Sequence, residues 1–158
     1  MAWARWLVLV PLLATACMNN GIEWSELDYT RSRPKEADLV GTWTVTEKTA
    51  RDIRDRGGYA KSDPKIVLLA DGTCSVIDMP DWWRGGFGHS HKQLESGQGK
   101  WKIEKEENVW TIYVLGLELP AGHQTVHLSR QRPPYLLHAT LGDPDSGNYM
   151  IFERATAS

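Results

Sequence analysis

A seven-residue stretch, Val40 to Thr46, limits the fold of this chain more than any other feature. Its side chains alternate between apolar and polar types, and a period of two residues is typical of a β-strand with one buried face. Similar runs follow it, each bounded by turn-forming residues, and together they predict an all-β domain of about eight strands. The predicted strands are Val40–Glu47, Lys65–Ala70, Thr73–Asp78, Gly99–Lys105, Val109–Leu115, Gln124–Ser129, Tyr135–Leu141 and Asn148–Arg154.

Turn geometry predicts how these strands pair. A three-residue turn that ends at Gly72, with this glycine in the left-handed conformation, sets Leu68 opposite Cys74. The same reasoning predicts the pairs Ile103–Trp110, Trp101–Ile112, Leu128–Leu137 and Ala139–Met150. Because these hairpins share one continuous apolar face, we expect an antiparallel up-and-down barrel, whose closure removes open strand edges.

Connection lengths give the predicted barrel two different ends. The connections at one end are tight turns, whereas those at the other end are longer. The long connections are Lys48–Pro64, Met79–Gln98, Gly116–His123 and Gly142–Gly147. Loops on a rigid scaffold often carry function, so we expect one closed end and one open mouth.

The predicted closed end resembles that of lipocalin-like barrels. Gly41-Thr42-Trp43 matches the Gly-x-Trp pattern that opens the first strand of lipocalins, and the order of strands agrees from Leu39 to Arg154. If the last strand returns beside the first, Arg154 lies next to Trp43, and a cation–π contact of about 1 kcal/mol follows. The resemblance implies that Gly41, Trp43 and Arg154 close the narrow end.

Residues 1–16 have the pattern of a signal peptide. Arg5 supplies the positive charge, and the apolar run that follows is too short to span a bilayer. Leu13-Ala14-Thr15-Ala16-Cys17 resembles a bacterial lipobox, which implies that Cys17 becomes the lipidated first residue. The alternative is ordinary secretory cleavage at the same bond. We then expect residues 17–38 to form a polar tether and residues 39–158 to form the barrel domain.

The same residues predict where in the cell the protein is located. Met18 after the cysteine, with no aspartate there, resembles lipoproteins sorted to the outer membrane, which implies an anchor on its periplasmic face. Secretion or display at the cell surface are alternatives. A net charge of −2, without a basic face interleaved with aromatic residues, argues against a nucleic-acid partner. Lipidation of Cys17 leaves Cys74 without a disulfide partner, and we expect it to be a small buried residue.

The predicted Met79–Gln98 loop carries the candidate binding residues, set among glycines. They are Trp82, Trp83, Phe87, His89 and His91. Exposed aromatic side chains in a loop often hold a ligand, a partner or a membrane surface. In the alternative, Trp82 and Trp83 fold inward and close the barrel.

The histidines are expected to be solvated. His89 and His91 offer two metal ligands, with Asp78, Asp81 or His123 as a third, but such pairs in glycine-rich loops are usually solvated. We therefore expect no metal and no cofactor. His127 and His138 are predicted to face each other on the outside of the barrel, also in water.

Functional motifs of common enzymes are missing from the sequence. It contains no Gly-x-Ser-x-Gly, no His-Glu-x-x-His and no phosphate-binding glycine loop, so we expect no catalysis. The sequence predicts a lipid-anchored periplasmic barrel that binds a small apolar or amphipathic ligand at its mouth. If Trp43, Trp101 and Trp110 fill the interior, the alternative is a protein-binding inhibitor or immunity-type lipoprotein that presents its long loops.

Overall fold

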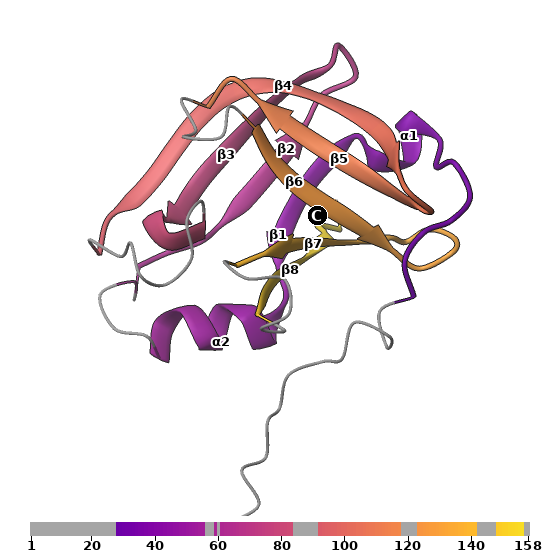
Figure 1. Cartoon of the computed structure of the whole chain (residues 1–158). Helices are drawn as coiled ribbons and strands as arrows, with labels where there is room; N and C mark the ends of the chain where they lie inside the picture. Colours follow the sequence, from indigo (N-terminus) through magenta and orange to yellow (C-terminus); the bar gives the residue numbers. More distant parts are fainter. Residues whose placement is uncertain are drawn as a thin grey trace, which may run out of the picture.

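The computed structural model describes residues 28–55, 59, 61–83, 92–117, 123–141 and 148–156. Eight antiparallel strands form a closed barrel, in which each strand pairs with its sequence neighbours and β8 pairs with β1 (Figure 1). The predicted all-β up-and-down barrel is confirmed. The strands are β1 (Gly41–Val45), β2 (Lys65–Leu68), β3 (Thr73–Pro80), β4 (Leu94–Glu106), β5 (Val109–Leu115), β6 (His123–Ser129), β7 (Leu136–Thr140) and β8 (Tyr149–Arg154).

Helices occupy some of the connections. A short helix, α1 (Glu36–Leu39), precedes β1, and a 3₁₀ helix, η2 (Asp81–Trp83), follows β3. Helix α2 (Glu47–Asp55) lies in the stretch that the sequence predicted to be a loop, and β1 ends at Val45 and not at Glu47. None of the helices in the described ranges is long and apolar enough to cross a membrane.

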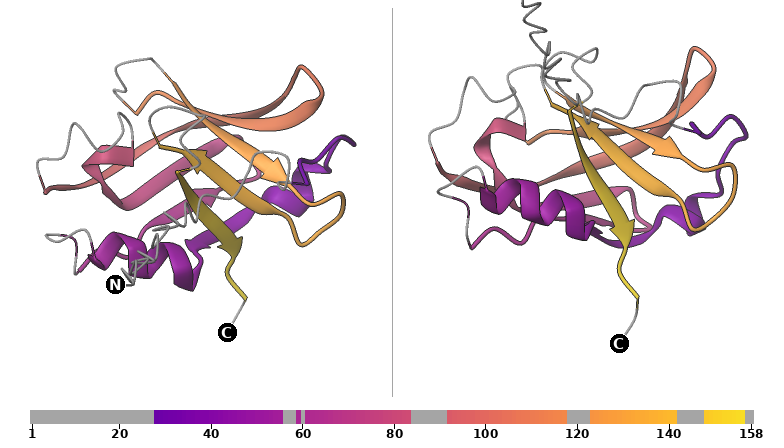
Figure 2. Two further views of the ribbon diagram at one scale, coloured as in Figure 1. Left: turned by 60° about the horizontal axis from the view of Figure 1, so that its bottom comes forward. Right: turned by 90° about the horizontal axis from the view of Figure 1, so that it is seen from below.

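Local chemistry explains where α2 begins. The hydroxyl of Thr46 accepts a hydrogen bond from the backbone N–H of Thr49 at 3.4 Å, which is the geometry of a helix N-cap. The hydroxyl of Thr49 in turn accepts a hydrogen bond from the backbone N–H of Ile151 in β8 at 3.2 Å. Figures 1 and 2 show α2 lying beside β8, and its Ile53 belongs to the core.

The predicted register is confirmed in most hairpins. The observed pairs Leu68–Cys74, Leu128–Leu137 and Ala139–Met150 are the predicted ones. The prediction for β4 and β5 was wrong by two residues, because Ile103 pairs with Ile112 and Trp101 with Val114. The turn there contains only Glu107 and Asn108, and Glu107 takes the positive φ of 51° that tight hairpin turns require.

Large apolar side chains fill the described part of the barrel. Trp43, Trp83 and Phe152 are among the largest fully buried residues, and Trp101 is also buried. Trp110 is only partly buried, so it does not fill the interior as the sequence suggested. Cys74 is buried and unpaired, as predicted.

Gly99 on β4 has no room for a side chain, because a Cβ atom there would lie 2.0 Å from the carbonyl oxygen of Leu115. We expect Gly99→Ala to lower the free energy of unfolding by about 3 kcal/mol, since the overlapping atom belongs to the backbone. Urea unfolding measures this loss. Gly97→Ala is the matched control, because its Cβ atom would meet only the flexible end of Leu117, at 3.2 Å. Equal losses in the two variants would contradict the prediction.

Candidate functional site

The closed end brings Trp43 and Arg154 together as cross-strand partners. The indole Nε1–H of Trp43 donates to the carbonyl oxygen of Leu39 at 2.9 Å. The guanidinium group of Arg154 donates to the carbonyl oxygens of Val40, at 2.6 Å, and Asp38, at 3.4 Å. Between these two described residues, the predicted cation–π contact does not form. The guanidinium group of Arg154 instead binds backbone carbonyl oxygens.

Gly41 leaves room for the Arg154 side chain, because it has no Cβ atom. Its φ is 143°, and a Cβ atom on it would lie 3.1 Å from Nε of Arg154. We expect Gly41→Ala to lower the free energy of unfolding by about 1–3 kcal/mol, because L-residues rarely adopt this backbone conformation. Thermal unfolding of Gly41→Ala, Arg154→Met and the double variant separates the two causes. The effects add if backbone strain alone is responsible, whereas the double variant recovers stability if the guanidinium contact contributes. An unchanged melting temperature in Gly41→Ala would refute both.

The opposite end carries the aromatic residues that the sequence singled out. Trp82 and Trp83 lie in η2 and are each 2% exposed. They share the core with Ile53 and Tyr59, which follow β1 in the chain. The burial agrees with the alternative in which both tryptophans fold inward. Three other candidate residues lie outside the described residues, so their roles stay predictions: Phe87, His89 and His91.

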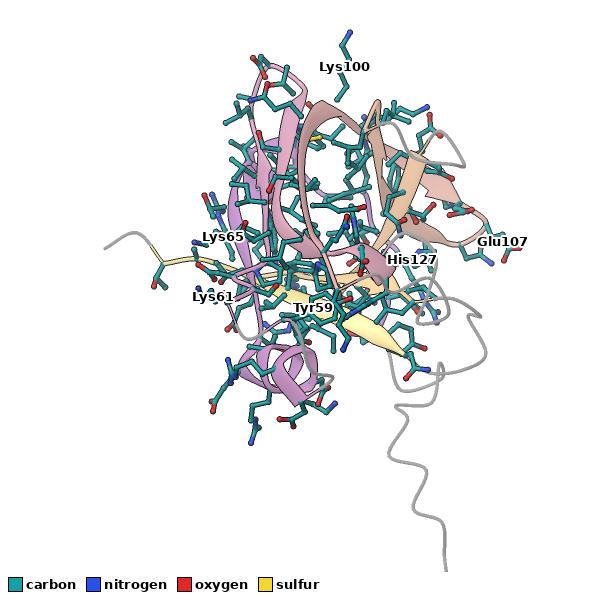
Figure 3. The ribbon with its side chains drawn as sticks, turned by 90° about the vertical axis from the view of Figure 1, so that its left-hand side faces the viewer. Tyr59, Lys61, Lys65, Lys100, Glu107 and His127 are labelled. Atoms are coloured by element: carbon teal, nitrogen blue, oxygen red, sulfur yellow. The ribbon has the colours of Figure 1, made fainter. Side chains whose placement is uncertain are left out.

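A buried carboxylate lies among these aromatic side chains. Asp81 is 8% exposed, and its Oδ1 accepts a hydrogen bond from the Tyr59 hydroxyl at 2.5 Å. Its Oδ2 accepts one from the backbone N–H of Gln93 at 3.4 Å. The ring of Trp82 meets that of Tyr59 edge-on, with centroids 6.0 Å apart. Figure 3 shows Tyr59 within the packed body of the molecule, in contrast to Lys100, which projects from the surface.

We call Ile53, Tyr59, Asp81, Trp82 and Trp83 the mouth cluster. It joins the two connections at this end that contain α2 and η2: the one from β1 to β2 and the one from β3 to β4. Chemically, it combines a carboxylate and a phenol hydroxyl with large apolar surfaces. Sequence reasoning named Asp81 only as a third metal ligand and missed Tyr59, whose one signal is an isolated aromatic residue in a polar connection. Within the described ranges, no group of three or more His, Cys, Asp or Glu side chains can hold a metal.

The outside of β6 and β7 carries a second cluster. His127 and His138 pair directly across the strands, as predicted. The expectation that both are solvated was wrong, since His138 is 2% exposed. Residues 28–33, which we call the strap, lie over this surface, although the sequence assigned them to a polar tether. Tyr29 in the strap forms a β-bridge with Ser129.

Backbone hydrogen bonding explains why the strap binds. Strands β5 and β6 pair only as far as Thr111 and His127. Beyond that point, the N–H of Thr30 donates to the carbonyl oxygen of Leu128, and the N–H of Trp110 donates to that of Thr30, both at 2.9 Å. Thr30 therefore pairs with both diverging strands and is fully buried. In Figure 1 the strap, in indigo, passes the tips of the β4–β5 and β6–β7 hairpins.

The histidine side chains have defined neighbours. Nε2 of His138 lies 2.7 Å from Oγ of Ser129, and Nδ1 of His127 lies 3.2 Å from Oγ1 of Thr111. The His138 ring meets Tyr149 edge-on, with centroids 6.2 Å apart. The Ser129–His138 pair has the spacing of a nucleophile and its base, and both residues are buried, at most 4% exposed.

Burial lowers the pKa of His138 to about 4, and the positive charges of protonated His127 and of Arg130 act in the same direction. Burial also lowers the pKa of His127. The unfolded chain therefore binds more protons than the folded one below the ordinary histidine pKa, about 6.5. We expect the two histidines to leave the free energy of unfolding unchanged above that pH and to lower it by up to about 3 kcal/mol as the pH drops to 4. Urea unfolding across this range tests it, and a His138→Gln variant with the same pH dependence would contradict the assignment.

Comparisons of the chain with protein-family models, with curated proteins and with solved structures give no match.

Proposed function

We propose that this protein is a lipid-anchored, lipocalin-like periplasmic protein without catalytic activity, which binds a small apolar or amphipathic ligand at the open end of its barrel. The lipobox-like sequence before Cys17 supports the anchor on the periplasmic face of the outer membrane. The mouth cluster carries the proposal for the ligand.

Binding sites for small molecules are typically apolar surfaces with a few polar groups that fix the ligand's orientation. The mouth cluster has this composition, with the Asp81 carboxylate and the Tyr59 hydroxyl among two indole rings. Its position at the end with the long connections is also typical of barrels that hold ligands. The carboxylate favours ligands whose polar part donates hydrogen bonds or carries positive charge.

Titration with N-phenyl-1-naphthylamine, an apolar amine whose fluorescence rises in apolar surroundings, tests this proposal. The protein is the chain from residue 17 onward, with Cys17→Ser to prevent lipidation. We expect saturable binding at one site, which Tyr59→Phe weakens and Gln131→Ala, at the closed end, leaves unchanged. Native mass spectrometry of the same protein then shows whether it retains a ligand from the cell. Absence of saturable binding and of any retained ligand would refute the proposal.

The burial of Trp43, Trp82, Trp83 and Trp101 favours a second candidate. Indole rings that occupy the interior leave less volume for a ligand, and the long loops then act as the functional surface, as in protein inhibitors and immunity-type lipoproteins. We expect such a protein to be recovered with one periplasmic partner after crosslinking in cells. Replacement of Phe87, His89 and His91 by alanine should abolish that recovery, and an unchanged recovery would contradict this candidate.

A further inference from the structure

The strap joins the barrel at its closed end, where residues 28–31 form hydrogen bonds with Arg130 and Gln131 in the β6–β7 turn. Its backbone pairs with Leu128 and Trp110 through Thr30, and the indole Nε1–H of Trp110 donates to the carbonyl oxygen of Arg31 at 3.2 Å. The guanidinium group of Arg33 lies over the Trp110 ring, 5.6 Å from its centroid. These interactions end at the buried Pro34, so the strap can leave the barrel without opening β1 to β8.

The surface beneath the strap contains the opposed histidines. The Tyr29 ring meets the His127 ring edge-on, with centroids 5.7 Å apart, and Tyr149 covers His138 from β8. The Nδ1 atom of His138 is buried and has no hydrogen-bond partner. A proton on that atom would therefore place a charge where nothing described accepts its hydrogen bond.

The remaining charges around the pair favour release as well. Arg130, in the turn after β6, opposes a positive charge on His138, and protonated His127 opposes it too. Glu106, at the end of β4, is the group that favours protonation of His127. The neighbours from the strap and from β8, Tyr29 and Tyr149, are phenols, and burial raises the pKa of Tyr29, so it supplies no compensating negative charge at low pH.

We propose that the strap is an acid-sensitive latch: protonation of the opposed His127–His138 pair releases residues 28–33 from the diverging ends of β5 and β6 while the barrel stays folded. The latch itself does not depend on the proposed function. In a lipid-anchored protein, however, release would lengthen the tether by six residues, or about 20 Å when extended, and so would set the distance between the barrel and the membrane.

NMR spectroscopy of the unlipidated chain from residue 17 onward, with Cys17→Ser, tests the latch between pH 7.5 and 4. The Thr30 amide and the Trp110 indole N–H report on the strap. The indole N–H groups of Trp43 in β1 and Trp101 in β4 report on the barrel, because they donate to the carbonyl oxygens of Leu39 and Leu69. We expect exchange of the Thr30 amide, corrected for its intrinsic pH dependence, to rise at least about tenfold, while the Trp43 and Trp101 signals keep their positions.

Variants assign the effect to its cause. Thr30→Pro removes the N–H that pairs with Leu128, and it provides the reference spectrum of the released strap at neutral pH. The double variant His127→Gln/His138→Gln should keep the strap bound down to pH 4. If that variant does not fold, Glu106→Gln decides, because loss of this carboxylate should move the transition to lower pH.

The outcomes separate the latch from general acid unfolding. A strap that stays bound at pH 4, or barrel signals that change together with the strap signals, would overturn the proposal. Release of the strap that persists in the double histidine variant would overturn it as well. If that variant does not fold, an unchanged pH of release in Glu106→Gln would overturn it. None of these outcomes bears on ligand binding at the mouth, so the latch and the proposed function fail independently.

Discussion

Replacement of Trp83 by alanine is expected to lower the free energy of unfolding by about 3–5 kcal/mol, the usual cost of removing a buried tryptophan. The side chain is 2% exposed and lies in the core with Ile53 of α2. Its loss should leave a cavity that neighbouring strands cannot fill, since a closed barrel collapses little. Urea unfolding at pH 7.5 measures the effect.

The matched control is Trp110→Ala at the opposite end. Trp110 is only partly buried, so the same change of side chain should cost clearly less stability there. A loss below about 1 kcal/mol in Trp83→Ala would show that the indole contributes little to the core. Such a result would favour the alternative in which this tryptophan is free to hold a ligand or a partner.

At the closed end, Trp43→Ala is expected to cost about 5 kcal/mol, the upper end for a buried tryptophan. The indole is fully buried, and its N–H satisfies the carbonyl oxygen of Leu39 at the end of α1. Removal of the ring therefore creates a cavity and also leaves a buried acceptor without its donor. The measurement is again urea unfolding, at low protein concentration if the variant aggregates.

A second substitution at the same position separates the two contributions. Trp43→Phe keeps much of the apolar volume but removes the hydrogen bond to Leu39, and we expect a loss of about 2 kcal/mol. Equal losses for alanine and phenylalanine would assign the whole effect to the hydrogen bond. That result would contradict the view that the ring itself fills the narrow end.

The strands could be predicted because their information is local. Alternation of apolar and polar residues predicted all eight strands, although β4 begins at Leu94 and not at Gly99. Turn geometry at Gly72 predicted the register of one hairpin. The predicted register of β4 and β5 was wrong because the tight turn depends on a positive φ at Glu107. Glutamate rarely adopts this conformation, so the sequence does not indicate it. Helix α2 was missed because it is mostly polar and buries only Thr49 and Ile53.

The two clusters were less predictable, since they depend on contacts between distant segments. The aromatic residues of the Met79–Gln98 region marked it as a candidate binding site. The hydrogen-bond donor to Asp81 is Tyr59, which lies 22 residues earlier in the chain. The surroundings of His127 depend on the strap, because the Tyr29 ring contacts it from a distant part of the chain. A polar composition suggested that the strap was solvated, whereas its backbone, not its side chains, provides most of the binding.

The pairing of Thr30 with both β5 and β6 has a consequence for how the protein can be shortened. A chain that began at Leu39, where the barrel domain was expected to start, would leave the N–H of Trp110 and the carbonyl of Leu128 without partners. Unpaired strand ends of this kind recruit strands from other molecules. Such a truncated protein should therefore self-associate, whereas one that begins ahead of Asp28 should remain monodisperse.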